Sequence, residues 1–380
     1  MSGIYIHIPF CKQKCSYCNF HFSTRLKGID AIQQALLAEI DMRSEEIASQ
    51  VIETIYLGGG TPSLWSVEDI NGLYSRIMHH TGRPDILEFT IECNPDDLSI
   101  DYLEDLKKHT EVSRISLGIQ SFHDEDLTLM NRSHDALEAR KSLENIFKTG
   151  FEEVSADLIF GLPPGDNTIS IHEKWRRNLE IMVQYPVNHI SCYNLTIEDN
   201  TVFKHQKDRG LIDLPEDEQT MEQFYAAKSF FQQNGFDHYE ISNYAKPGHH
   251  ALHNTNYWKN TPYIGIGPSA HSYDGFRRRW NVADNQKYQK LIHAGEVYWD
   301  AEDLTEWDRY NEYIMTGLRT MWGVEEEKID QFSADLSLEF YRNLKLEKLK
   351  GNIVSEKARH VLSSQGQAIA DSVISGFFYV

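Results

Sequence analysis

The chain has 380 residues, 41% of them hydrophobic and 25% charged, as in soluble proteins with one large domain and a smaller one, or with two of ordinary size. Asp and Glu number 57 against 37 Lys and Arg, and the net charge of −20 excludes a general attraction to nucleic acid or anionic lipid. No apolar run approaches the ~20 residues that span a bilayer. The first residues lack a signal-peptide pattern, and an odd number of cysteines, five, favours the cytoplasm.

Apolar, β-branched strand patterns alternate with helical patterns through the first half of the chain. The predicted strands cover residues 4–8, 54–57, 88–91, 113–119, 154–160 and 189–195. The predicted helices cover residues 31–48, 66–79, 100–108, 137–149 and 169–184. This order predicts an α/β fold with a parallel sheet, and six strand–helix units favour a partial (βα)6 barrel over a closed eightfold one.

The alternation weakens after about residue 201. Residues 216–234 have a helical pattern, but residues 239–281 are rich in Gly, Asn, His and aromatics without clear periodicity. From about residue 302 the pattern is mostly helical, and residues 358–380 fit short strands and a final helix. We therefore expect a core over residues 1–240, a connecting region over 241–300, and a mostly helical C-terminal domain over 301–380.

Three cysteines, Cys11, Cys15 and Cys18, lie within eight positions directly after the first predicted strand. Thiolates at this spacing can converge on one soft metal centre from a single loop. On a [4Fe–4S] cluster, three cysteines leave one iron open to a small-molecule ligand. The alternative is a structural zinc site, with His7 or His21 as the fourth ligand. Cys93 and Cys192 fit no ligand spacing, and we expect them to be buried thiols.

The motif CxxxCxxC, with Tyr17 before its last cysteine, resembles the cluster motif of the radical S-adenosylmethionine (SAM) superfamily. The preceding string YIHIPFC resembles the start of the coproporphyrinogen III dehydrogenase-like subgroup, which includes heme chaperones. The resemblance continues through most of the chain. It implies a radical SAM barrel with a [4Fe–4S] cluster on the three cysteines. It also implies SAM on the open iron, cleaved to methionine and a deoxyadenosyl radical when the cluster is reduced.

Glycine and polar residues follow the ends of successive predicted strands. Glycine lets the backbone approach a ligand closely, although a tight turn or a capped strand end would look the same. The resemblance implies a SAM amino-group site at Gly59, Gly60 and Thr61, a ribose site at Glu92 and a carboxylate partner at Arg132. It further implies that Gln120, Asp157, Thr196 and His271 belong to the SAM site, and that Tyr5 and Tyr17 pack beside the cluster and SAM. Both tyrosines could equally be core aromatics.

Two features separate the heme chaperones from the dehydrogenase. The dehydrogenase has a further cysteine two positions after the motif, where this chain has Phe20, and a longer segment before its first strand. The string HNxxYW from His253 to Trp258 resembles a heme-binding motif of the chaperones, since histidine ligates heme iron and aromatics pack on porphyrins. Alternatives are a structural histidine, or ligation by His249 or His250.

The resemblance therefore implies a heme chaperone that binds heme at His253 and passes it to heme-accepting proteins. An electron donor such as a flavodoxin or ferredoxin and a homodimer are further expected partners, and nucleic acid is not. The arginines at 277–279 are either partners of the heme propionates or a solvated surface. The alternative functions are oxygen-independent coproporphyrinogen III dehydrogenation, which Phe20 disfavours, and a zinc-binding structural role.

Overall fold

A twelve-stranded sheet organises the protein, which was analysed as a computed structural model that describes residues 2–82, 85–165 and 169–379. Six parallel strands form its centre in chain order, each hydrogen-bonded to the next. They are β1 (Ser2–Ile8), β2 (Ile52–Gly59), β3 (Glu88–Cys93), β4 (Arg114–Gln120), β5 (Glu153–Phe160) and β6 (His189–Asn194). All six predicted strands are confirmed, and their carboxyl ends meet at one edge of the sheet.

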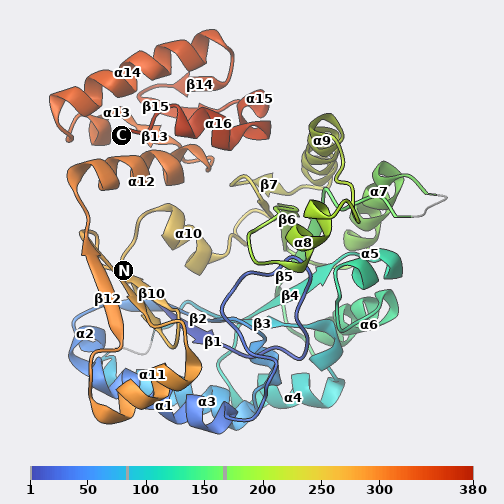
Figure 1. Ribbon diagram of the computed structural model, residues 1–380, viewed down its shortest axis with the longest axis vertical. Coiled ribbons are helices and arrows are strands. Elements are labelled where there is room, and N and C mark those ends of the chain that lie inside the picture. The colour runs from blue at the N-terminus through green and yellow to red at the C-terminus, as the bar shows by residue number, and fades with distance from the viewer. Residues whose placement is uncertain (1, 83–84, 166–168, 380) are drawn as a thin grey trace.

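Helices connect the parallel strands and cover the outer face of the sheet (Figure 1). They are α1 (Ile29–Met42), α2 (Ser44–Ala48), α3 (Val67–His80), α4 (Ile100–His109), α5 (Asp124–Leu129), α6 (Ala136–Lys148) and α7 (Ile171–Met182). The prediction of one helix over residues 31–48 was wrong at residue 43, where the backbone leaves helical geometry between α1 and α2. There the Arg43 guanidinium is buried and donates to the Gly265 carbonyl at 2.6 Å.

The segment over residues 241–300, much of which shows no clear periodicity in sequence, extends the same sheet on both sides. After α8 (Val202–Asp208) and α9 (Asp217–Gln233), the chain adds β7 (Asp237–His238) and β8 (Asn243–Ala245) beside β6. It then forms α10 (Leu252–Trp258) and crosses to the other side of the sheet. There β9 (Tyr263–Ile266) pairs in parallel with β1, followed by β10 (His271–Tyr273), β11 (Arg277–Asn281) and β12 (Trp299–Asp303), with α11 (Asn285–Ala294) between the last two.

A buried carboxylate ties α1 to this late segment. Glu39 is fully buried and accepts hydrogen bonds from the Gly267 amide at 2.7 Å, Asn281 Nδ2 at 2.9 Å and the Tyr288 hydroxyl at 2.6 Å. A buried charge is tolerated only when its oxygens are satisfied in this way. The first helix and the segment over residues 241–300 are therefore one packed unit, although more than 200 residues separate them along the chain.

The C-terminal part has its own apolar core, which includes Tyr310, Phe340 and Phe377. Its helices are α12 (Glu306–Leu318), α13 (Glu326–Ile329), α14 (Ala334–Leu349), α15 (Ser364–Ala368) and α16 (Ala370–Ser375). A small sheet of β13 (Val324–Glu325), β14 (Ile353–Glu356) and β15 (Arg359–Leu362) lies among them. Figure 1 shows this part beyond α10, at one end of the molecule. The division at residues 240 and 300 stays a prediction, since β8 to β12 share the main sheet.

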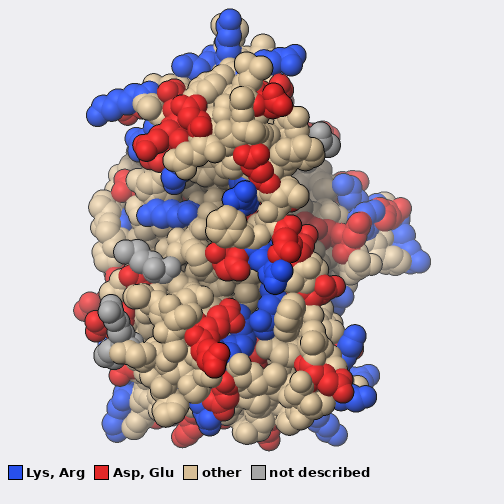
Figure 2. Space-filling view, turned by 90° about the vertical axis from the view of Figure 1, so that its left-hand side faces the viewer, with Lys and Arg blue, Asp and Glu red and all other residues tan. Residues whose placement is uncertain are grey.

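Among the described residues, no helix is both long and apolar enough to cross a bilayer. On the face seen in Figure 2, acidic and basic side chains are interspersed. The arginine run on β11 is part of this mixture, because Arg277 pairs with Asp303 at 2.6 Å and Arg278 pairs with Glu312 at 2.7 Å. These pairings favour the solvated-surface interpretation of the run.

Candidate functional site

The three cysteines lie on one loop, residues 9–28, which we call the cysteine loop. Its ends are joined where the Cys11 amide donates to the Ser23 carbonyl at 3.1 Å and the Ser23 amide to the Pro9 carbonyl at 2.9 Å. The segment after α5 supports its middle, since the Ser16 amide donates to the Met130 carbonyl at 2.9 Å. The loop therefore has a defined backbone, and its three cysteines are half-buried at the carboxyl end of β1.

Arg132 connects the cysteine loop to the ends of β3 and β4. Its Nη1 lies 3.3 Å from the Cys15 sulfur and 3.4 Å from the Tyr17 hydroxyl. Its Nη2 donates at 2.8 Å both to Asn94 Oδ1 and to the Gly118 carbonyl, while its buried Nε has no partner. A guanidinium at this position stabilises a thiolate, the form of cysteine that ligates metal.

Burial raises the pKa of two of the thiols, that of Cys11 to about 11 and also that of Cys18, so a neighbouring cation would favour their ionised forms. A hydrogen bond with Thr61 lowers the pKa of Cys11 by part of this amount. Within the described residues, no three His, Cys, Asp or Glu side chains converge on the position of a single metal ion. The rings proposed as a fourth zinc ligand are engaged elsewhere: His7 Nε2 lies 2.8 Å from the His21 carbonyl, and His21 Nε2 lies 2.7 Å from Asn285 Oδ1. These contacts give the zinc alternative no support.

The turn after β2 accepts only glycine at two positions. Gly59 has φ of 104°, and a Cβ there would lie 2.4 Å from the His7 ring. A Cβ on Gly60 would lie 2.4 Å from the Phe10 carbonyl oxygen and 2.6 Å from that of Ile8. The Gly60 amide donates to the Ile8 carbonyl at 2.8 Å, and the Thr61 amide donates to the Phe10 carbonyl at 2.7 Å. These bonds hold the turn against the end of β1.

Four neighbouring polar or aromatic side chains within the parallel strands are half-buried: Tyr5 on β1, Tyr56 on β2, Glu92 on β3 and Asp157 on β5. We call these four residues the inner row. Glu92 accepts from the Tyr56 hydroxyl at 2.7 Å and from the Gly59 amide at 3.1 Å. The row connects the glycine turn to the carboxylates and forms a polar surface between strand ends.

Both carboxylates of the inner row hold protons more tightly than usual. Burial raises the pKa of Glu92 to about 7, with a further contribution from the charge of Asp157. Burial likewise raises the pKa of Asp157 to about 6. A cationic ligand between them would favour the ionised forms and lower both pKa values. Perturbed carboxylates at the carboxyl edge of a parallel sheet are typical of a ligand site.

The other predicted SAM residues fall into two groups. Gln120 ends β4 with φ of 69°, a strained conformation for a residue other than glycine, and lies close to Arg132 around Gly118. Thr196 and His271 are exposed. Thr196 lines a neighbouring cavity, and the His271 ring lies 6.2 Å from Trp280. The SAM role of each residue stays a prediction.

Sequence reasoning missed two residues of this site, Tyr56 and Asn94. Tyr56 pairs with Tyr5 in the register of β1 and β2, and the two rings stack at 6.0 Å. Asn94 follows β3 directly and joins Arg132 to the Thr61 hydroxyl, at 2.8 and 3.4 Å. The rule that polar residues follow strand ends could have found Asn94. Cys93 and Cys192 are buried, as predicted.

A cavity of about 730 Å³ adjoins the site on the side of α10, and we call it the α10 cavity. Its wall includes Thr196, the segment over residues 240–243, Arg319 and residues 367–372 of the C-terminal part. Asn254, Tyr257 and Trp258, three of the four residues specified by the HNxxYW string, also line it. Its size and its aromatic wall are those of a small-molecule site.

His253, the first residue of that string, lies behind the cavity wall. It is 2% exposed, with Nδ1 2.8 Å from the Thr54 hydroxyl and Nε2 2.9 Å from the Tyr257 hydroxyl. Its ring stacks on Tyr56 at 5.1 Å, and burial lowers its pKa to about 3. Both ring nitrogens thus have hydrogen-bond partners within the protein. Iron ligation by His253 stays a prediction, and it would require the ring to break its hydrogen bond with Thr54 or with Tyr257.

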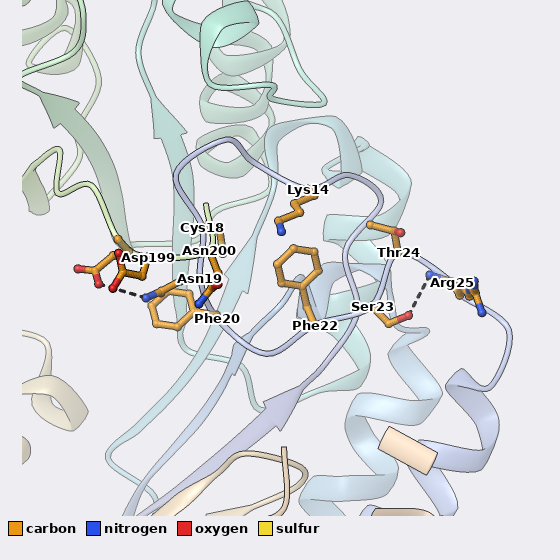
Figure 3. Close-up of a pocket in the computed structure, with 11 residues that line it drawn as sticks. Lys14, Cys18, Asn19, Phe20, Phe22, Ser23, Thr24, Arg25, Asp199 and Asn200 are labelled. Atoms are coloured by element: carbon orange, nitrogen blue, oxygen red, sulfur yellow. Dashed lines mark hydrogen bonds between the residues drawn. The ribbon is translucent and has the colours of Figure 1, made fainter. Parts of the chain in front are cut away.

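The outer side of the cysteine loop borders a second hollow of about 580 Å³ (Figure 3). Figure 3 shows Phe22 and Lys14 between the Cys18–Phe20 end and the Ser23–Arg25 end of the lining. Phe20, at the position of the dehydrogenase cysteine, is 70% exposed at this hollow. The loop carries Lys12, Lys14, Arg25 and Lys27 and no acidic residue, in contrast to the net charge of −20.

Comparison with known proteins gives consistent matches. Residues 5–174 match the radical SAM superfamily. The heme chaperone HemW of Bacillus subtilis is 34% identical over 382 residues, which cover 99% of both chains. HemW of Lactococcus lactis is 34% identical over 331 residues, covering 87% of this chain and 84% of that protein. The structure of coproporphyrinogen III oxidase (HemN) from Escherichia coli, described as a radical SAM enzyme, has a TM-score of 0.82 at 22% identity, covering 99% and 89% of the chains.

The parallel sheet, the cysteine loop and these matches define a radical SAM protein with a HemN-like fold. Superfamily membership implies a [4Fe–4S] cluster and SAM. The residues present fit both groups, because Arg132 lies against a cysteine sulfur and the glycine turn and inner row offer polar groups beside it. By identity and coverage, the chain belongs to the HemW family within the superfamily.

Proposed function

We propose that this protein is a heme chaperone that holds a [4Fe–4S] cluster on Cys11, Cys15 and Cys18, binds SAM beside it, and carries heme in the α10 cavity to acceptor proteins. The observation that carries the proposal is the cavity itself. It combines aromatic side chains from the HNxxYW string with a volume of about 730 Å³, next to the inner row. The name of the relatives, heme chaperone HemW, supports heme as the ligand.

At the cluster, the chain's own contribution is to hold three thiolates at the carboxyl end of β1. Arg132 places a positive charge beside Cys15, with Nη1 3.3 Å from its sulfur, which favours a thiolate as ligand. A bound cluster supplies one-electron chemistry and an iron open to a further ligand. The spacing of the cysteines and the support of the loop by the Met130 carbonyl favour this assignment.

For SAM, the proposed contacts follow from chemistry. Carbonyl oxygens of the turn at Gly59 and Gly60 accept from the amino group, and Thr61 adds a hydroxyl. Glu92 accepts from ribose hydroxyls, and its hydrogen bonds from Tyr56 and Gly59 hold it in place. Asp157 contributes negative charge, while Gln120 and Arg132 suit the carboxylate. We propose Tyr5 and Tyr17 as flanking aromatics, and Thr196 and His271 as outer contacts.

The cysteine loop suits an acidic electron carrier. Lys14, Arg25 and Lys27 supply positive charge there, whereas Lys12 is paired with Asp96 and Asp97, and Glu198 and Asp199 line the adjoining hollow. Phe20 adds exposed apolar area at the edge of the loop. Weak electron-transfer complexes commonly use small interfaces of this kind, with charge complementarity that speeds association. We therefore propose a flavodoxin or ferredoxin as the reductant, docking beside Lys14 and Arg25.

The first test is heme titration of anaerobically reconstituted protein, comparing wild type with Trp258→Ala. The control variant is Trp280→Ala on β11, outside the described cavity lining. We expect tight heme binding that weakens in Trp258→Ala and persists in the control. His253→Ala and Tyr257→Phe identify the ligand: if His253 binds iron, only His253→Ala changes the heme absorption spectrum.

The same samples are assayed for coproporphyrinogen turnover, because the solved HemN fold favours that reaction as the second candidate. Turnover without specific heme binding would replace the chaperone proposal by the dehydrogenase one. Heme binding without turnover, followed by transfer to an apo-hemoprotein, supports the chaperone. Equal heme binding in wild type and Trp258→Ala would show that heme binds elsewhere.

A further inference from the structure

One cationic side chain lines the α10 cavity in the described part of the chain, Arg319. It follows α12, and its backbone is fixed against the segment over residues 239–241. The Ile241 amide donates to the Arg319 carbonyl at 3.0 Å, and the Met321 amide donates to the Tyr239 carbonyl at 2.9 Å. The guanidinium lies over the Trp258 ring, with its Cζ 5.9 Å from the ring centroid. A positive charge thus stands at a fixed point of an aromatic wall.

The partner of this guanidinium is unusually exposed. Arg319 Nη1 lies 2.6 Å from Asp371 Oδ1 on α16, with side-chain exposures of 23% and 89%. An ion pair with so exposed a carboxylate contributes little to stability, because water solvates the carboxylate nearly as well as the guanidinium does. Asp371 itself lines the cavity. A carboxylate that enters the cavity can therefore replace Asp371 at small energetic cost.

Glu240, a buried carboxyl group in the same wall, has one oxygen without a partner. It is 2% exposed, and its Oε1 accepts from the Ser242 amide at 3.1 Å and from Asn243 Nδ2, whereas its Oε2 has no hydrogen-bond partner among the described residues. Buried polar atoms are nearly always satisfied, so an orphan oxygen beside a cavity indicates a missing ligand group. Burial raises the pKa of Glu240 to about 7, so its protonated form is available to donate to a carboxylate.

We propose that Arg319 is the carboxylate-binding residue of the α10 cavity, and that a ligand carboxylate displaces Asp371 from it. This inference rests on the proposed function. A flat tetrapyrrole with propionates at its rim matches the combination of an aromatic wall with one guanidinium. The arginines of β11 are not part of this recognition: none lines the cavity, and Arg277 and Arg278 already pair with Asp303 and Glu312.

The test compares heme with heme dimethyl ester, which keeps the ring and the iron but has no carboxylate. Both are titrated into anaerobic full-length protein as wild type, Arg319→Gln, Asp371→Asn and the matched control Arg277→Gln. We expect wild type to bind heme more tightly than the ester. Arg319→Gln should weaken heme binding about tenfold or more, the loss of a charge-assisted hydrogen bond, and leave ester binding unchanged. Arg277→Gln should behave as wild type.

Asp371→Asn gives the sharpest outcome, since removing a carboxylate from the wall should tighten heme binding, by up to about fivefold. Asp371 is exposed enough that this change leaves folding intact. The variant therefore tests carboxylate binding by Arg319 even if Arg319→Gln is unstable. Equal affinity of wild type for heme and ester, or weaker heme binding in Asp371→Asn, would overturn the assignment while leaving the chaperone proposal in place. If wild type binds neither compound, both fail.

Discussion

The inner row predicts a conflict between stability and ligand binding at Glu92. Burial raises the pKa of this carboxyl from an ordinary 4.5 to about 7, so the folded protein resists its ionisation. At about 1.4 kcal/mol per pH unit, this difference amounts to about 3 kcal/mol of lost stability once the group is ionised. Because the side chain is half-buried, solvent screening reduces the expected loss to about 1–3 kcal/mol.

The perturbation is Glu92→Gln in cluster-free protein. Glutamine keeps one oxygen for the Gly59 amide, and its amide can donate to the Tyr56 hydroxyl, so both contacts survive without the charge. The folded pKa lies above the unfolded one. Wild type therefore has full stability below about pH 4.5 and loses it as the pH rises toward about 7. The variant should match wild type near pH 4.5 and exceed it by about 1–3 kcal/mol at pH 8.

Urea unfolding followed by tryptophan fluorescence at several pH values measures this difference. Glu104→Gln, an exposed position within α4, is the matched control and should change stability little at any pH. The stabilised variant should bind SAM about tenfold more weakly, because a charge-assisted hydrogen bond is lost. A variant that is no more stable than wild type at pH 8, or equally stabilised at every pH, would refute the burial argument.

Three further outcomes follow from the site. Cys11→Ser should lose most iron and sulfide after reconstitution, whereas the buried Cys192→Ser should retain them, as measured by iron and sulfide content. Gly60→Ala should abolish SAM binding and lower the free energy of unfolding, because its Cβ would lie 2.4 Å from a carbonyl oxygen. The control, Gly72→Ala on α3, has open space around the new Cβ, and urea unfolding should show a free energy of unfolding about 0.5–1 kcal/mol higher than that of wild type. Lys14→Glu should slow reduction by an acidic flavodoxin in stopped flow at low salt, and equal rates in wild type and variant would rule out docking at the cysteine loop.

The sequence predicted the parallel core well, because buried parallel strands are short apolar runs whose neighbours along the chain are also neighbours in space. It failed at β9, a four-residue strand that contains Gly265 and is followed by Gly267, because this strand is defined by its pairing with β1. It also failed at the break at Arg43, since the reason for that break, the Gly265 carbonyl, lies 222 residues away. Long-range partners leave no local periodicity, so such features need the assembled fold.

At the site, the end of the third predicted strand and the family resemblance pointed to Glu92, and the resemblance alone pointed to Asp157; the structure shows both as half-buried groups within strands. Tyr56 was missed because an aromatic inside a strand looks like core; only the register against Tyr5 reveals it. Arg319 had no sequence signal at all, because its relation to Trp258 arises from the packing of α12 beside α10. Its predicted role therefore depends on the structure alone.

The pairing of β9 with β1 also governs how the protein is made. β1 leads directly into the cysteine loop, yet its neighbour on one side is about 260 residues further along the chain. During synthesis, this strand has an unpaired edge until residue 266 has left the ribosome. The hydrogen bond from the Gly267 amide to Glu39 cannot form before that point either. A ribosome stalled before that residue therefore leaves β1 with one unpaired edge, next to the cysteine loop.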